Sequence, residues 1–188
     1  AVMYPGDHSM RKQENIPDTF FRKYFLICFT SLLFLVFIDQ GTKLLAQKYL
    51  RDQPDFTIIP GILRLHYLYP ENRGIAFGMF QGGVAFFAVL SLIFLAIILY
   101  AWARIPKNPF YFPLLAVSTL MAAGAVGNFI DRFYRKYVID FIYFSLIDFP
   151  VFNVADIYVV VSGILLILLV CIKYRDDDFT FLNPMHRG

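Results

Sequence analysis

Four long, mostly apolar runs constrain the fold of this 188-residue chain more than any other sequence feature. Each is close to the roughly 20 residues that a helix needs to cross the hydrocarbon core of a bilayer. Of all residues, 59% are hydrophobic and only 16% are charged, whereas soluble domains are about a quarter charged. The sequence therefore predicts an all-α integral membrane protein, a bundle of four transmembrane helices at about residues 22–45, 84–103, 110–130 and 154–172.

The longest polar segment lies between the first two predicted spans, at about residues 47–83. Within it, apolar and polar residues alternate from Leu63 onward, and the Pro60-Gly61 pair just before them is typical of a turn. We therefore expect Phe56–Tyr69 to form a small sheet or hairpin that lies on the membrane.

Both ends of the chain lie outside the predicted domain, which comprises residues 22–173. Residues 1–10 read as an expression scar, and residues 174–188 read as a flexible tail. The first apolar run is followed by the charged Asp39 and not by a small-residue cleavage site. We therefore expect this run to stay in the protein as a span.

Charge, cysteine and histidine patterns argue against several classes of protein. The net charge is +3 and the basic residues are scattered, which gives no case for nucleic-acid binding. Cys28 and Cys171 both fall inside predicted spans, which argues against a disulfide framework. His8, His66 and His186 are dispersed and lack the spacing of metal ligands, so we expect no metal and no cofactor.

Two aspartates occupy apolar surroundings that normally exclude charge. Asp140 sits between Val138-Ile139 and Phe141-Ile142, and Asp156 lies where the fourth apolar segment begins. A carboxylate at the edge of a hydrocarbon phase costs several kcal/mol unless it is paired, wetted or protonated. We interpret the two aspartates as one catalytic pair held at a membrane surface.

The order of the spans places the main polar clusters on one side of the membrane. Successive spans run in opposite directions, so the end of one span and the start of the next share a side. This argument predicts a single active site at one leaflet. The clusters are Asp39 after the first span, Asn72–Phe77 before the second, Asn128, Asp131 and Arg132 at the end of the third, Asp140 after it, and Asp156 at the start of the fourth.

Two adjacent carboxylates share one proton, because both cannot be ionised cheaply. The ionised acid can take a proton from a water molecule that attacks a carbonyl, while the protonated acid donates to the carbonyl oxygen. The roles reverse as the amine leaves, so a peptide bond is hydrolysed without a metal or a nucleophilic serine. Asn153 is a candidate N-cap of the fourth helix, whose positive end would favour ionised Asp156 and leave the shared proton on Asp140.

Other charged residues near these acids can be interpreted as structural ion pairs as well as functional groups. Asp39 and Lys43 are four residues apart on one helical face, which suits an anchoring ion pair, support of the active site, or both. Asp131 with Arg132 or Arg135 reads more readily as a surface ion network than as part of the chemistry.

Five short motifs, in this order on four spans, resemble the lipoprotein signal peptidases, also called signal peptidase II. Each motif is weak alone, and together they are specific. The resemblance covers about Arg22 to Lys173, and no motif position departs from the family pattern. The motifs are Asp39-Gln40-Gly41-Thr42-Lys43, Asn72-Arg73-Gly74-Ile75-Ala76-Phe77, Gly127-Asn128-Phe129-Ile130-Asp131-Arg132, Val138-Ile139-Asp140-Phe141 and Phe152-Asn153-Val154-Ala155-Asp156.

The resemblance implies an aspartyl endopeptidase that removes the signal peptide from diacylglyceryl-modified prolipoproteins by cutting before the lipidated cysteine. Asp140 and Asp156 match the catalytic pair of the family. The implied fold adds a small extracytoplasmic β-cradle and a short interfacial helix, which the Phe56–Tyr69 segment and the loop flanking Val84 fit. The residues implied to support the site or the substrate are Asp39, Lys43, Asn72, Gly74, Asn128, Asp131, Arg132 and Asn153.

The resemblance also implies the location and the partners. The expected location is the bacterial cytoplasmic membrane, and the expected partners are a lipidated prolipoprotein, membrane phospholipids and globomycin-type cyclic peptides, with the enzyme a monomer. The two sides of the membrane differ little in their number of Lys and Arg residues. The Arg104–Lys107 connection and the Arg22-Lys23 pair nevertheless favour cytoplasmic termini. The active site then faces the extracytoplasmic side.

Three rival interpretations remain at the level of sequence. A transporter or proton-relay subunit also uses intramembrane aspartates, although the chain has no repeated halves. A presenilin-like protease would carry its second aspartate in a Gly-x-Gly-Asp motif, whereas the acids here follow Val-Ile and Val-Ala. A membrane scaffold without enzymatic activity leaves the two acids without a purpose.

Overall fold

The structure is a computed structural model that describes residues 18–73 and 83–182. Four helices in these ranges are long and apolar enough to cross a membrane, which confirms the predicted fold class. The first helix is longer than the predicted span of about 22–45 at both ends, and it continues through Asp39 and Lys43, whose charges pair with each other. The helices are α1 (Asp18–Tyr49), α2 (Val84–Arg104), α3 (Phe112–Ile130) and α4 (Val154–Ile172).

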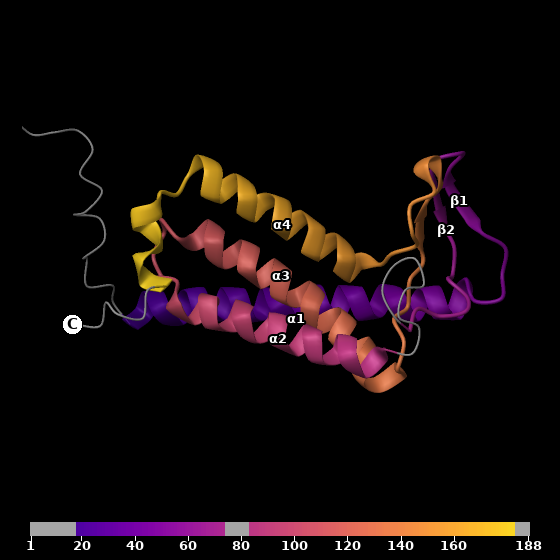
Figure 1. Ribbon diagram of the computed structural model, residues 1–188, viewed down its shortest axis with the longest axis horizontal. Helices are drawn as coiled ribbons and strands as arrows, with labels where there is room; N and C mark the ends of the chain where they lie inside the picture. The colour runs from indigo at the N-terminus through magenta and orange to yellow at the C-terminus, as the bar shows by residue number, and fades with distance from the viewer. Residues whose placement is uncertain (1–17, 74–82, 183–188) are drawn as a thin grey trace, which may run out of the picture.

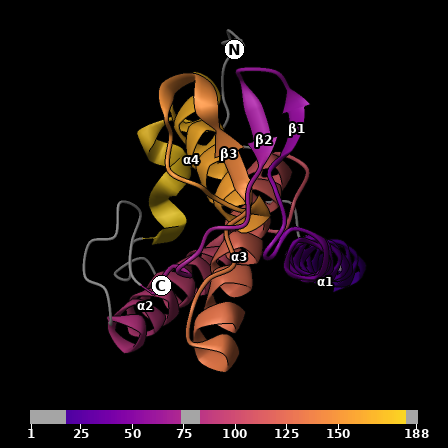
Figure 2. The ribbon, with the colours of Figure 1, turned by 90° about the vertical axis from the view of Figure 1, so that its right-hand side faces the viewer.

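Helix α3 lies at the centre of the bundle and contacts each of the other three spans (Figures 1 and 2). Small residues of α3 allow this close packing. A Cβ atom at Gly124 would lie 2.5 Å from the carbonyl oxygen of Ala155, and one at Gly127 would meet the Asp39 carboxylate. The glycines therefore let α1 and α4 approach α3 where the polar motifs meet.

A small antiparallel sheet lies beyond one end of the helices (Figure 1). Its strands, in the order β1-β2-β3, are β1 (Phe56–Ile59), β2 (Leu63–Leu65) and β3 (Ile142–Phe144). The expected hairpin is confirmed as β1 and β2, and its turn contains Gly61 at a φ of +73°. The third strand was not foreseen from the sequence, since it comes from the distant segment that follows Asp140.

The other end of the bundle is closed by the C-terminal segment, which differs from the flexible tail expected from residue 174 onward. Residues Asp176–Leu182 form a 3-10 helix, η5, drawn in yellow in Figure 1. Tyr174 is buried and stacks on Tyr111 with ring centroids 5.8 Å apart, and the Tyr111 hydroxyl donates to the Asp178 carbonyl at 2.9 Å. Aromatic packing therefore holds this segment against the loop between α2 and α3.

Two predicted features fall in the range 74–82, outside the described residues. They are Gly74 and the interfacial helix that was assigned to the loop flanking Val84.

Candidate active site

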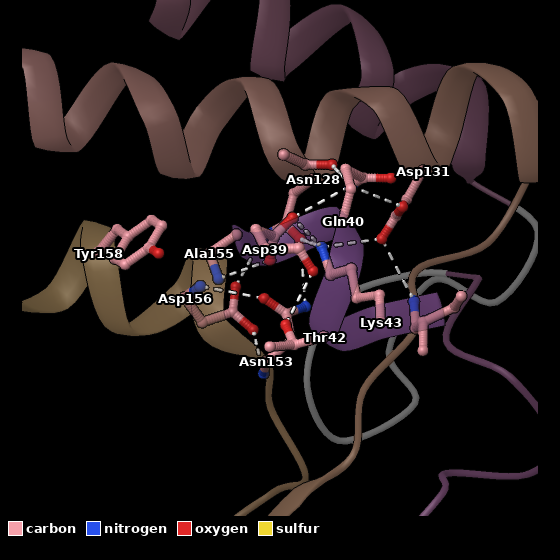
Figure 3. A network of polar contacts seen from close by, with 12 residues as sticks. Asp39, Gln40, Thr42, Lys43, Asn128, Asp131, Asn153, Ala155, Asp156 and Tyr158 are labelled. Carbon is pink, nitrogen blue, oxygen red and sulfur yellow. Dashed lines mark hydrogen bonds and ion pairs between the residues drawn. The ribbon is translucent and has the colours of Figure 1, made fainter. Parts of the chain in front are cut away.

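The polar motifs of five distant segments meet at the sheet end of the bundle, and Figure 3 shows the contacts among those of α1, α3 and α4. Asn72, from the segment after β2, joins them by donating to Asp140. The other four segments are the second half of α1, the last turn of α3, the segment leading into β3, and the first turn of α4. The sequence argument that placed these motifs at one end of the bundle is therefore consistent with the fold.

Asp140 is fixed by the sheet and by two asparagines. Its segment runs beside β2, and its carbonyl oxygen accepts a hydrogen bond from the backbone N–H of Leu68 at 3.0 Å. Its side chain is 3% exposed and accepts from Asn72 Nδ2 at 2.8 Å and from Asn153 Nδ2 at 2.6 Å. Both carboxylate oxygens therefore have a donor, which holds the side chain in one orientation.

Asp156 is fixed by the first turn of α4. Asn153 is the N-cap of this helix, as predicted, and its side-chain oxygen accepts from the backbone N–H of Asp156 at 3.1 Å. The Asp156 carboxylate in turn accepts from the backbone N–H of Asn153 at 3.1 Å, which completes a capping box. Its other oxygen accepts from Asn128 Nδ2 at 2.7 Å.

Asn153 thus contacts both aspartates, and the two acids are close enough to influence each other. Burial raises the pKa of Asp140 to about 6, and the negative charge of Asp156 acts in the same direction. The hydrogen bonds from Asn72 and Asn153 oppose this rise in pKa. A carboxyl group with a pKa near 6 can hold a proton or release it near neutral pH.

Behind this pair lies an ion cluster in which Asp39, Lys43 and Asp131 are all 0% exposed. Lys43 Nζ lies 2.9 Å from a carboxylate oxygen of Asp39 and 2.9 Å from one of Asp131. Arg135 forms a further ion pair with Asp131. The ion pair expected between Asp131 and Arg132 or Arg135 is therefore present with Arg135, but its expected surface location is wrong, because Asp131 is buried and also pairs with Lys43. Two acids and two basic groups leave the cluster formally neutral.

Asp39 also joins the first helix to the last. Its Oδ1 atom accepts a hydrogen bond from the backbone N–H of Ala155, one of the free donors at the start of α4, at 2.9 Å. Gln40 Nε2 donates to Asp39 at 3.0 Å and to the Gly127 carbonyl at 3.1 Å. The sequence argument gave no role to Gln40, although its place between Asp39 and Lys43 was a signal. The contact of Ala155 could not be predicted, because its residue type does not indicate that its backbone N–H donates to a distant side chain.

A cavity of about 450 Å³ opens beside the two aspartates. Its polar wall carries Asn72, Asn128, Arg132, Asp140 and Asp156, and its apolar wall comes from the Phe149–Phe152 segment and from Ile157, Val160 and Val161 on α4. A second hollow of about 250 Å³ shares Arg132 and reaches Ser91 on α2. Arg132 therefore lies between two spaces next to the acids.

Of the predicted site residues, all except Gly74 lie in the described ranges, and all of these belong to one network or its cavity. Asp39, Lys43 and Asp131 are in the buried cluster, and Asn128 and Asn153 connect it to the acids. The arrangement provides two adjacent acids, amide donors, one guanidinium and an apolar wall. Such a set can activate water against a carbonyl in a chain held at a membrane.

Fold and site together define a multi-pass membrane enzyme. The sequence model of the family Signal peptidase (SPase) II matches residues 31–172. A lipoprotein signal peptidase of Caldanaerobacter subterraneus subsp. tengcongensis is 43% identical over 141 residues, 74% of this chain and 92% of that relative. One from Streptococcus pyogenes serotype M1 is 36% identical over 149 residues, 79% of this chain and 93% of that relative.

Two solved structures of bacterial membrane enzymes, both determined by the in meso method, share the fold. One has a TM-score of 0.68 at 32% identity and covers 76% of this chain and 85% of its own. The other has a TM-score of 0.65 at 28% identity and covers 79% and 94%. The chain belongs to the signal peptidase II family, the lipoprotein signal peptidases.

Proposed function

We propose that this peptidase is an aspartyl endopeptidase in which Asp140 and Asp156 activate the attacking water. The observation that carries the proposal is the position of Asn153, which donates to Asp140 through its side chain and pairs with Asp156 through the capping box. One residue thereby holds two acids that are far apart in sequence beside a cavity of about 450 Å³.

In the proposed mechanism, the two acids share one proton. Asp140 holds it, in keeping with its raised pKa of about 6, and ionised Asp156 accepts a proton from water at the positive end of α4. The water oxygen attacks the scissile carbonyl carbon, and Asp140 donates its proton to the carbonyl oxygen. The proton that Asp156 has gained then passes to the departing amine nitrogen as the C–N bond breaks. One hydroxyl of the tetrahedral intermediate returns its proton to Asp140 as the carbonyl of the new acid forms, which restores the starting state of both acids.

The proposed substrate is a prolipoprotein with a diacylglyceryl group on the cysteine that follows the cleavage site. The apolar wall of the cavity, with Phe149 and Phe152 on one side and Val160 on α4, suits hydrocarbon next to the reacting amide. The polar wall with Arg132 suits the peptide carbonyls at the cleavage site. We expect globomycin-type cyclic peptides to compete for this cavity.

The proposed location is the bacterial cytoplasmic membrane, with cytoplasmic termini, an extracytoplasmic site and a monomeric enzyme among phospholipids. The sheet lies at one end of the bundle, opposite η5 (Figure 1). Asp140 lies just before strand β3 of this sheet, and Asp156 lies in the first turn of α4. Arg22, Lys23 and Arg104 lie at the η5 end, where basic residues favour the cytoplasm.

The test is cleavage of a synthetic precursor by the purified protein in detergent micelles, with the cysteine either lipidated or free. We expect efficient cleavage before the lipidated cysteine and poor cleavage of the free form, with no ion gradient or added metal required. Equal turnover of the two forms would contradict the substrate assignment. A requirement for an ion gradient would instead favour a transport-linked role.

A further inference from the structure

The ammonium group of Lys43 has three polar partners inside the protein. It donates to Asp39 at 2.9 Å and to Asn128 Oδ1 at 3.0 Å, and it lies 2.9 Å from Asp131. The first two contacts are with groups on α1 and α3, so the ammonium sits where these helices meet (Figure 3). The contact with Asn128 leads directly to the side chain of Asp156. The contact with Asp39 instead reaches α4 through the backbone N–H of Ala155.

The chemistry of that contact fixes the direction of the Asn128 amide. An ammonium group can only donate hydrogen bonds, so the atom that faces Lys43 must be the amide oxygen. The amide nitrogen then faces the other way, and it donates to Asp156 at 2.7 Å. Asn153 Nδ2 donates to the same oxygen at 3.1 Å, but it is a neutral donor that also serves Asp140.

A charge-assisted hydrogen bond to the oxygen of an amide also strengthens the donor at its nitrogen, because neighbouring hydrogen bonds polarise one another. The path from Lys43 to Asp156 contains a single amide. The path to Asp140 also requires Asn153, whose amide donates toward both Asn128 and Asp140. Through hydrogen bonds, Lys43 therefore reaches Asp156 by one amide and Asp140 by two. Its charge also acts directly on Asp140, but that is the weakest of the effects on the pKa of that acid.

We propose that Lys43 is a positioning residue that orients and polarises Asn128 so that Asp156 is the acid kept ionised. The inference rests on the proposed function, because it concerns which acid of that pair serves as the base. It also explains why a lysine is fully buried at this place. Asp156 gains a proton during the reaction, and Lys43 then keeps Asn128 from turning to present its oxygen.

The test is the pH profile of kcat/KM for the double variant Asp39→Asn, Lys43→Met. The double change removes one positive and one negative charge, so the cluster stays formally neutral, and the amide oxygen introduced at position 39 can still accept from Ala155. The remaining charged groups that face the acids are Arg132 next to both, with Asp131 and Arg135 behind. We expect the acid limb of the profile to move up by about one pH unit, which lowers activity about tenfold on that limb.

A matched control is Lys107→Met, because Lys107 is also buried but lies near the opposite end of the bundle. Its amine donates to the backbone carbonyls of Ala103 and Ile105. We expect this variant to melt at a lower temperature without any movement of the acid limb. A double variant that is folded and has the pH profile of the wild type would overturn the proposal.

A second variant keeps the proposal testable if the double variant does not fold. Asn128→Ala leaves the ion cluster in place and removes the amide that links it to Asp156, so the acid limb should move in the same direction. A uniform loss of activity with an unmoved limb would overturn the role of Lys43. Near-normal cleavage in either Asp140→Asn or Asp156→Asn would instead overturn the catalytic pair, which separates the two failures.

Discussion

Asn153 Nδ2 lies 2.6 Å from Asp140 Oδ1, although Asn153 begins the last helix and Asp140 lies on the segment that enters the sheet. The bond ties the end of the bundle to the sheet at the point where the two acids meet. The geometry of the site therefore depends on the sheet as much as on the helices. A change that loosens either of them should be visible in catalysis.

The first prediction concerns the two acids. Asp140→Asn and Asp156→Asn keep the size of each side chain but remove its ability to exchange a proton, so each should lower the cleavage of a lipidated precursor by about 10²–10⁴-fold. Thermal melting in detergent should show that both variants are folded. Asp148→Asn, at an exposed loop position, is the matched control and should cleave normally. Near-normal cleavage by either of the first two variants would refute the catalytic pair.

The second prediction concerns stability as a function of pH. The folded protein holds a proton on Asp140 up to a pKa of about 6, against an ordinary value of 3.8, so the unfolded chain binds fewer protons between these values. The contribution of Asp140 to the free energy of unfolding therefore decreases as pH rises from about 4 to about 6, by at most about 3 kcal/mol in total. The Asp140→Asn variant should not show this decrease, because asparagine does not titrate.

The measurement is the difference in melting temperature between Asp140→Asn and the wild type at several pH values. The difference should move in favour of the variant as pH rises from 4 to 7. It should then level off, because Asp140 of the wild type is ionised in both states. A difference that stays constant over this range would show that the pKa of Asp140 is not raised.

The third prediction concerns the packing of α3 on α4. A methyl group at Gly124 would lie 2.5 Å from the Ala155 carbonyl oxygen and 2.7 Å from a methyl carbon of Val159. Gly124→Ala should therefore push α4 away and cost about 1–3 kcal/mol, with a loss of cleavage because Asp156 moves too. Gly163→Ala on α4 meets no atom within 4 Å and should be neutral or stabilising. Equal melting temperatures and equal activities for the two variants would show that the contact is not tight.

The fourth prediction concerns the aromatic closure at the far end of the bundle. Tyr111→Phe removes the hydroxyl that donates to the Asp178 carbonyl and should cost about 1 kcal/mol of stability. Tyr100→Phe is a suitable control, because Tyr100 is 53% exposed and its hydroxyl only accepts from Arg104. Cleavage should be unchanged in both variants, since the proposed active site lies at the opposite end of the bundle. A loss of cleavage in Tyr111→Phe at a temperature where it is folded would indicate coupling between the two ends.

The sequence was sufficient to predict the spans and the meeting of the polar motifs, because both follow from chain length and apolar composition. An apolar run of about 20 residues has few alternatives to a transmembrane helix. Alternating directions then determine which motifs share an end. The N-cap at Asn153 was also predictable, since an asparagine three residues before an acid at a helix start satisfies two backbone donors.

Other features depend on long-range contacts that a local pattern does not contain. Strand β3 has only three residues, and its partner β2 lies far away in the sequence. Asp131 next to Arg132 is typical of a solvated surface pair, but the distant Lys43 makes burial of the acid possible. The acidic segment from residue 174 onward was expected to be a flexible tail, whereas the rings of Tyr174 and Phe181 pack against the distant Tyr111.

The hydrogen bond from Ala155 to Asp39 sets an order for biosynthesis. Asp39 enters the membrane with the first span, but its partner is translated more than a hundred residues later. The nascent chain therefore lacks both Asp156 and the contact that places it until the final span has left the ribosome. On the proposed mechanism, a translation product that ends before Ala155 lacks both this contact and one of the two acids, so it should have no proteolytic activity.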